Sequence, residues 1–410
     1  MEWMERVHRM ALDRRRLGAL RGTGILDTPR EGRFDRFVEA ACALLEAPMA
    51  AINFVDADRQ WTKAEAGLGG LEQEPLAESM CAHTLEQDAT LVVEDASEDP
   101  RFAGGRFAAD GVRFYAGHPV HAPNGEPIGS LCVMDTQRRS LSGRDRKVLV
   151  VLAGLVESEI AYSGELDRAA QVQRMLLPHA SPELPGYRIA GRCAPSGSIG
   201  GDFFAWQLLQ DGTLQIHFAD VMGKGIPAAL IAASFRAVLM GASRFNDQLT
   251  TIRRAAIASQ ELFEDTESFA TLFSARLDPA TGGLCYVDAG HGLAAVLGQN
   301  GTPRRLRTGG LPIGVKRDDD WGLGEERLRP GETLVVLSDG VLDLFPSIEA
   351  ALAALARSAP AGDLTPERIV DAAMDHALRH KHSDDVTILA LRRTRPPRPT
   401  RPGLMPRTRP

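Results

Sequence analysis

The sequence predicts an α+β protein with two folded domains joined by a long helix. The chain has 410 residues, which is more than one hydrophobic core usually accommodates. Short strand-like runs alternate with helical and turn-rich segments in two stretches, about 22–143 and 185–392. Between them, residues 144–177 contain no proline and follow a helical pattern. Strand-rich order with inserted helices favours a layered α+β architecture.

Composition and charge are those of an ordinary globular chain, with 44% hydrophobic and 25% charged residues. The longest apolar stretches, such as 148–156, are far shorter than the roughly 20 residues of a membrane span, and residues 1–16 lack the apolar region of a signal peptide. We therefore expect a cytoplasmic protein without a membrane partner. The five cysteines include no C-x-x-C pair, so we expect neither a disulfide framework nor a zinc site.

The C-terminal segment is strongly basic. Residues 392–410 hold seven arginines and no acid, so the rest of the chain is more acidic than the net charge of −7 indicates. An acidic body argues against nucleic acid as the main partner. Residues 393–410 are rich in proline and are expected to form a disordered tail, either solubilising or used for docking.

The connecting helix, residues 144–178, is predicted to pair as a coiled coil and to make the protein a homodimer. Its apolar residues at a and d spacing are Leu152, Leu155, Tyr162, Leu166, Ala169 and Leu176. Glu159 and Gln173 interrupt this stripe, and two glycines each weaken the helix by about 1 kcal/mol relative to alanine. A plain connector helix is the alternative.

The domain that follows, residues 179–392, contains a predicted β-hairpin with an aspartate at each end. If Gln210–Gly212 form a three-residue loop, Asp202 lies opposite Asp220. Their carboxylates would then be about 5 Å apart and repel by roughly 3 kcal/mol at an effective dielectric near 20. A hard cation such as Mg²⁺ or Mn²⁺ would remove this penalty. Turn capping by both acids is the alternative.

Further acids lie at strand ends. Asp339 ends the apolar run "TLVVLSDG", and Asp384 and Asp385 begin "SDDVTILALR". Each alone is typical of a turn or loop, but carboxylates at strand ends can converge on one edge of a sheet. The domain has no G-x-S-x-G elbow, and His291 in "DAGH" is either a general acid or a hydrogen-bonded structural residue.

The segments "GGDFF", "ADVMGKGIPAAL", "FATLFSARLDPATGGLCYVDAGH", "GGLPIGV", "LSDGV" and "SDDVTILAL" occur in this order. Over residues 170–392 the chain thereby resembles bacterial metal-dependent serine/threonine phosphatases of the type 2C superfamily, in the sporulation and stress-response branch. The resemblance implies an α/β/β/α sandwich. It also implies that Asp202, Asp220, Asp339 and Asp384, with the backbone carbonyl of Val221, hold two Mn²⁺ or Mg²⁺ ions, Asp385 being the second choice at the last position. Met222 stands where that family more often has a small residue.

The first domain, residues 1–160 with an N-terminal helix, contains "GILDTPREGRFDRF", "SMCAHTL", "VRFYAGHPV" and "IGSLCVMDT", and over residues 15–160 it resembles GAF sensory domains. That resemblance implies a small ligand without naming it. Cys81 and His83 make a poor metal pair, and a buried cysteine is the simpler interpretation.

The two resemblances together imply a sensor-regulated phosphatase for phosphoserine or phosphothreonine in a partner protein. The partner that the family suggests is an anti-sigma-factor antagonist. The alternative is a catalytically silent phosphatase-like module that sequesters a signalling partner.

Overall fold

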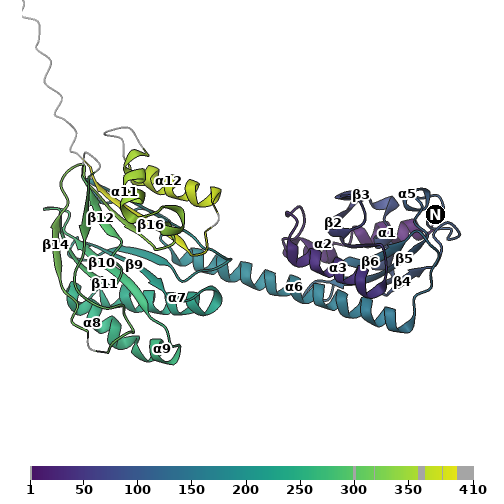
Figure 1. Ribbon diagram of the computed structural model, residues 1–410, viewed down its shortest axis with the longest axis horizontal. Helices are drawn as coiled ribbons and strands as arrows, with labels where there is room; N and C mark the ends of the chain where they lie inside the picture. The colour runs from purple at the N-terminus through teal and green to yellow at the C-terminus, as the bar shows by residue number, and fades with distance from the viewer. Residues whose placement is uncertain (1, 299–301, 318, 359–364, 381, 395–410) are drawn as a thin grey trace, which may run out of the picture. The chain divides into compact units, whose positions relative to one another are not determined.

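The computed structural model describes residues 2–298, 302–317, 319–358, 365–380 and 382–394, and it divides the chain into two units, residues 1–167 and 168–410 (Figure 1). The first unit is one antiparallel sheet in the order β3-β2-β1-β6-β5-β4 with helices on both faces. Its strands are β1 (Met49–Val55), β2 (Arg59–Ala66), β3 (Gln73–Pro75), β4 (Leu91–Val93), β5 (Phe114–His121) and β6 (Pro127–Asp135). Its helices are α1 (Glu2–Ala11), α2 (Arg14–Gly22), α3 (Gly32–Leu45), α4 (Met80–Gln87), α5 (Arg106–Ala109) and the first part of α6 (Gly143–Leu176).

Alternation along the strands gives this sheet two different faces. On β1, Ile52 and Phe54 belong to an apolar core shared with α3 and α6. The intervening Ala51 belongs to a second core with residues of α4. Asn53 follows on that second face and is also buried, which places a polar side chain in the interior.

Helix α6 is continuous across the boundary between the two units, as the proline-free pattern predicted. One residue of the predicted pairing stripe is not available for pairing, because Leu152 is 6% exposed and belongs to the core of the first unit. Leu155, Tyr162 and Leu176 are 47%, 55% and 37% exposed. The stripe that remains therefore begins at Leu155.

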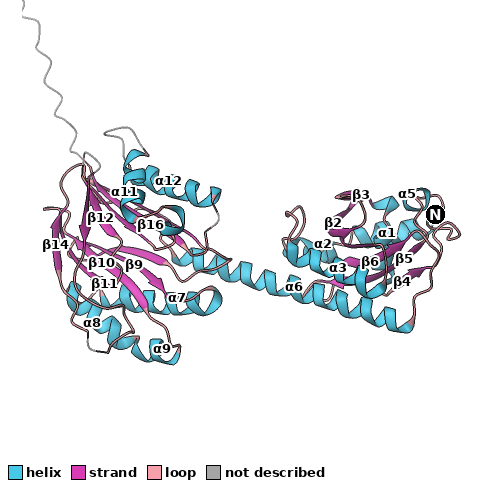
Figure 2. Cartoon of the chain, viewed as in Figure 1, coloured by secondary structure: helices cyan, strands magenta, loops and turns pink. Residues whose placement is uncertain are grey.

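The second unit contains two five-stranded antiparallel sheets, ordered β14-β11-β10-β9-β8 and β13-β12-β15-β16-β7 (Figure 2). Its strands are β7 (Tyr187–Ala194), β8 (Phe203–Leu208), β9 (Leu214–Val221), β10 (Ala270–Leu277), β11 (Gly283–Ala289), β12 (Ala294–Leu297), β13 (Pro303–Leu306), β14 (Gly324–Arg327), β15 (Thr333–Leu337) and β16 (Val386–Arg393). Its helices are α7 (Gly225–Ala242), α8 (Gln248–Ala258), α9 (Gln260–Asp265), α10 (Val341–Leu344), α11 (Ile348–Arg357) and α12 (Pro366–Arg379).

Three apolar cores hold these layers together. Phe218 and Phe273 of one sheet pack with Val336 and Leu389 of the other in the central core. Helices α7, α8 and α9 cover the outer face of the first sheet, and α11 and α12 cover the outer face of the second. This order of layers confirms the predicted α/β/β/α sandwich.

One detail differs from the sequence prediction, namely where the basic tail begins. Arg393, expected to be the first residue of the basic tail, is the last residue of β16. Residues 395–410, which make up the rest of that predicted tail, lie outside the described residues.

Within the described residues, one helix has the length and apolar composition of a membrane span, namely α7. Its Ile231 and Phe235 are buried in the core beneath the first sheet of the sandwich. A core helix passes the same test, so this finding is weak evidence for a membrane span.

Candidate metal centre and catalytic site

The β8–β9 hairpin places two of the predicted acids together. Phe203 pairs with Ala219 and Leu208 with Leu214, which is the register predicted from a loop at 210–212. Asp202 immediately precedes β8 and Asp220 is the penultimate residue of β9, so the same register sets them opposite each other. Asp202 is 3% exposed, and its Oδ2 has no hydrogen-bond partner among the described residues.

The other acids lie where β15 ends and β16 begins. These strands are antiparallel neighbours, with Leu337 opposite Ile388, so Asp339 after β15 and Asp384 before β16 lie at the same sheet edge. The backbone N–H of Ser338 donates to the Thr387 carbonyl over 2.9 Å. A side chain at Gly340 would place its Cβ 2.2 Å from the carbonyl oxygen of Asp385, so glycine is required for this close approach.

Asp385 is engaged by the loop that precedes Asp202. Its Oδ1 accepts hydrogen bonds from the backbone N–H and hydroxyl of Ser196, over 2.8 and 3.2 Å. Its Oδ2 accepts from the N–H of Gly201 over 2.8 Å. Both oxygens thus hold backbone in place, whereas the side chain of Asp384 is 44% exposed, 3.7 Å from the ammonium of Lys224. This division of roles favours Asp384 over Asp385 as a metal ligand.

The acids interact electrostatically. Burial, followed by the charge of Asp220, raises the pKa of Asp202 well above its ordinary value. Burial and the charges of Asp339, Asp384 and Asp385 raise the pKa of Asp220 to about 7. Burial and then Asp384 raise the pKa of Asp339. A cluster of carboxylates that suppress one another's ionisation is typical of a functional site, and a cation would relieve the repulsion.

The oxygen ligands of this cluster are of the type that a divalent cation binds, but their side chains do not form a complete coordination site. Carboxylate and carbonyl oxygens are the ligands that Mg²⁺ prefers, and the unpartnered Oδ2 of Asp202 is available for such a bond. However, no three His, Cys, Asp or Glu side chains of the described segments form a ready-made metal site. The carbonyl oxygen of Val221 packs against the backbone of Gly201, because a Cβ added to Gly201 would lie 2.5 Å from that oxygen. Metal binding therefore requires the side chains of these aspartates to move closer together.

Two residues near the cluster were not foreseen from the sequence. Asp343, one helical turn beyond Asp339, accepts hydrogen bonds from the N–H and hydroxyl of Ser383, each over 2.7 Å, and so fixes the residue before Asp384. Gln173 of α6 donates its Nε2–H to the carbonyl of Gly200 over 2.6 Å and accepts the Gly200 N–H over 3.2 Å. The only sequence signal for Gln173 was its polarity within an apolar stripe.

His291 is 7% exposed, and burial lowers its pKa to about 4. Its Nδ1 lies 3.3 Å from the hydroxyl of Thr271, the residue opposite Asp220 on β10. A neutral, buried imidazole favours the structural interpretation of this residue over the general-acid one.

A four-layer sandwich with carboxylates gathered at strand ends of both sheets defines the class of metal-dependent phosphatase domains. The comparison with family models agrees, because residues 210–394 match stage II sporulation protein E, and residues 29–160 match the GAF domain. Residues 210–394 therefore form a SpoIIE-type, PP2C-like phosphatase domain that follows a GAF domain, which confirms both resemblances. Asp220, Asp339 and Asp384 lie inside the matched phosphatase segment, and Asp202 lies just before it.

Relatives of known name are similar to parts of the chain. Phosphoserine phosphatase RsbU of Bacillus subtilis is 27% identical over 189 residues, covering 46% of this chain and 56% of RsbU. A cyclic di-GMP phosphodiesterase of Pseudomonas aeruginosa is 35% identical over 140 residues, covering 33% of this chain and 24% of the relative. The solved SiaA-PP2C domain of Pseudomonas aeruginosa shares 23% identity, with a TM-score of 0.47, over 56% of this chain and 95% of that domain. The chain thus spans between about a quarter and just over half of the curated relatives' length.

Proposed function

We propose that the second unit is a metal-dependent phosphatase that removes phosphate from phosphoserine or phosphothreonine in a partner protein, and that the first unit regulates it. The observation that carries the proposal is the convergence of four aspartates from two different sheets, three of which have raised pKa values. The match to the SpoIIE family and the similarity to a phosphoserine phosphatase support the same activity.

Asp202, Asp220, Asp339 and Asp384, with the carbonyl of Val221, would hold two Mn²⁺ or Mg²⁺ ions. Ions bound there would lower the pKa of a water and offset the charge of the phosphate, so no side-chain nucleophile would be needed. The chain's other residues hold the ligands in place. Asp385 fixes the loop leading into Asp202, and Asp343 fixes Ser383 beside Asp384.

The substrate we propose is a phosphorylated anti-sigma-factor antagonist, as in the partner-switching branch that the sequence resembles. The test is hydrolysis of a phosphoserine peptide and of a small phosphate ester by the full chain, with Mn²⁺, with Mg²⁺ and with a chelator. We expect turnover that depends on the metal and disappears with the chelator. Tight binding of a partner without any turnover in either metal would instead identify a silent binding module.

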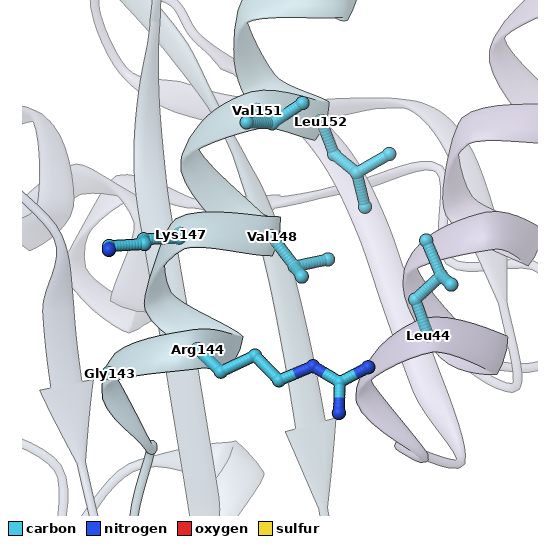
Figure 3. Close-up of a pocket in the computed structure, with 7 residues that line it drawn as sticks. All are labelled: Leu44, Gly143, Arg144, Lys147, Val148, Val151 and Leu152. Carbon is cyan, nitrogen blue, oxygen red and sulfur yellow. The ribbon is translucent and has the colours of Figure 1, made fainter.

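We also propose that the protein dimerises through α6, so that ligand binding in the GAF domain is transmitted along this helix. Leu155, Tyr162 and Leu176 leave an apolar stripe exposed. Within the first unit, Leu44 of α3 and Val148 and Val151 of α6 line an apolar groove of about 610 Å³ (Figure 3). A second copy is the occupant we propose for this groove and for the exposed apolar residues of α6, and sedimentation at micromolar concentration tests it.

Ending the chain after Thr394 is expected to leave turnover of the small ester within about two-fold of the full chain, because none of the proposed site residues follows Thr394 in the sequence. Ending it after Leu391 should lower stability, since Arg393 donates hydrogen bonds to the carbonyls of Thr281 and Leu328. Turnover and thermal melting of both truncations check this. A large loss of turnover after the Thr394 truncation would show that residues 395–410 contribute to the site.

A further inference from the structure

Two cysteines meet in the core of the first unit. Cys81 of α4 and Cys132 of β6 are 3% and 0% exposed, and their sulfur atoms lie 3.8 Å apart. The sulfur atoms of a disulfide are about 2 Å apart, so bond formation requires the two sulfurs to approach each other by roughly 2 Å. The two residues are 51 positions apart in the sequence, which is why their spacing gave no sign of the pair.

Hydrogen-bond donors point at the Cys81 sulfur. The Nδ2–H of Asn53 donates to it over 3.2 Å, and the hydroxyl of Tyr115 over 3.5 Å. Tyr115 is itself held by Thr84, with 2.7 Å between their hydroxyls. Burial alone would raise the pKa of Cys81, but the hydrogen bonds from its neighbours lower it to about 7.

The pKa of Cys81 is lowered, whereas the pKa values of the other four cysteines are raised. Burial raises the pKa of Cys42, Cys193 and Cys285, whereas Cys132 has its pKa raised well above the usual range, first by its contact with Cys81 and then by burial. Cys132 thus stays a thiol and donates to the Ala51 carbonyl over 3.6 Å. A thiolate beside a thiol is the arrangement that thiol oxidation to a disulfide requires.

The surroundings of the pair are polar, although they are buried. Thr62, Asn53 and Ser130 are cross-strand neighbours on β2, β1 and β6, and each has a buried oxygen without a partner among the described residues. Burial and the charge of Cys81 raise the pKa of nearby Glu74 to about 8, so this acid is neutral at neutral pH and does not repel a thiolate. The sulfur atoms therefore lie on a polar rather than a purely apolar interior face.

A small cavity lies at the start of α4, next to the helix that carries Cys81. A cavity of about 20 Å³ is lined by residues that include Ser79, Met80 and His83, which flank Cys81 in the sequence. A cavity of this volume holds about one water molecule, and hydrogen peroxide is only slightly larger.

We propose that Cys81 and Cys132 form a peroxide-reactive dithiol that gives the sensor domain a redox input. The Cys81 thiolate attacks one oxygen of hydrogen peroxide, the O–O bond breaks, and Cys81 becomes a sulfenic acid while hydroxide leaves. The Cys132 thiol then attacks the Cys81 sulfur, its proton passes to the departing oxygen as the S–O bond breaks, and water leaves with the formation of the disulfide. Two thiols are oxidised, one peroxide is reduced, and with two protons it yields two waters.

The test treats the fully reduced, full-length protein with a small excess of hydrogen peroxide at neutral pH, followed by alkylation of the remaining thiols. We expect the intact mass to fall by two hydrogen atoms before alkylation, only three of the five cysteines to be alkylated afterwards, and peptide mapping to find Cys81 linked to Cys132. Cys42, Cys193 and Cys285 should remain alkylated and act as internal controls. Oxidation of these three before the pair, or a disulfide between any other two cysteines, would overturn the proposal.

Two variants separate the chemical steps. Cys132→Ala should trap the sulfenic acid on Cys81, detected as a gain of one oxygen and by reaction with dimedone. Tyr115→Phe keeps both cysteines and the shape of the core but removes one donor, and should slow disulfide formation about five-fold. A Tyr115→Phe protein that reacts at the wild-type rate, or a folded Cys132→Ala protein without an adduct at Cys81, would contradict the assigned roles.

Discussion

Asp202→Asn and Asp339→Asn are each expected to reduce turnover of a phosphoserine peptide by roughly 100- to 1000-fold or more at saturating Mn²⁺. Asparagine keeps the shape of the side chain but removes the negative charge that binds and balances a divalent cation. The loss of turnover should be larger for Asp202→Asn, because Asp202 is buried and its Oδ2 has no other partner in the described part of the chain. Initial rates across a Mn²⁺ titration distinguish weaker metal binding from slower chemistry.

The same substitutions are expected to leave metal-free stability unchanged or higher. Burial and neighbouring charges raise the pKa values of Asp202 and Asp339, which means that their ionised forms destabilise the folded state at neutral pH. Asparagine removes that repulsion, so melting temperatures in chelator should not fall.

Asp371→Asn is the matched control for both measurements, because this α12 residue is 57% exposed and pairs with Arg192 over 3.4 Å, away from the cluster. It should change neither turnover nor melting. Wild-type turnover in Asp202→Asn or Asp339→Asn would contradict the two-metal proposal, and a large fall in melting temperature would assign the aspartate a role in the fold instead.

The relative positions of Asp202 and Asp220 could be predicted because they depend on a local rule. The Gln210–Gly212 loop determines the hairpin register, and register determines that Asp202 faces Asp220. The choice between Asp384 and Asp385 could not be made in this way. Neighbouring residues at the entry of a strand point in different directions, and only the packed loop shows that Asp385 accepts hydrogen bonds from Ser196 and Gly201.

Some strands lack the apolar alternation by which a sequence pattern identifies a strand. The edge strand β14 (Gly324–Arg327) is Gly-Glu-Glu-Arg, and charge is common on sheet edges because it discourages further pairing. Strand β2 contains Lys63, which is 1% exposed and whose ammonium is bound by Thr28, Pro29 and Glu31. A buried lysine is rare and depends on partners distant in sequence, so a local pattern cannot anticipate it.

Gln173→Leu is expected to weaken Mn²⁺ binding and turnover by roughly 10-fold or more, since losing hydrogen bonds to a buried backbone costs about 1–3 kcal/mol. Gln173 holds both the N–H and the carbonyl of Gly200, and that glycine lies against Asp385, whose Oδ2 would be 1.9 Å from an added Cβ. The final turns of α6 and the loop leading into Asp202 therefore move together. Gln171→Leu, at an exposed position of the same helix, is the matched control and should leave both quantities unchanged.

Because Gln173 binds the backbone of Gly200, a leucine at position 173 should affect the site as well as the pairing of α6, whereas a leucine at position 159 should affect pairing alone. Glu159 is also engaged, by Arg33 over 3.0 Å, so Glu159→Leu should strengthen pairing of α6 without touching the loop. The double variant Glu159→Leu with Gln173→Leu should show the strongest dimerisation in sedimentation. Its activity should stay at one level that no longer responds to the GAF ligand. A ligand shifts an equilibrium only by its differential affinity for the two states, and stronger pairing would exceed that shift. A wild-type chain that stays monomeric at micromolar concentration would remove pairing from the control mechanism. If Gln173→Leu then still lowered Mn²⁺ affinity, the coupling would act within a single chain, from the end of α6 to the loop before Asp202.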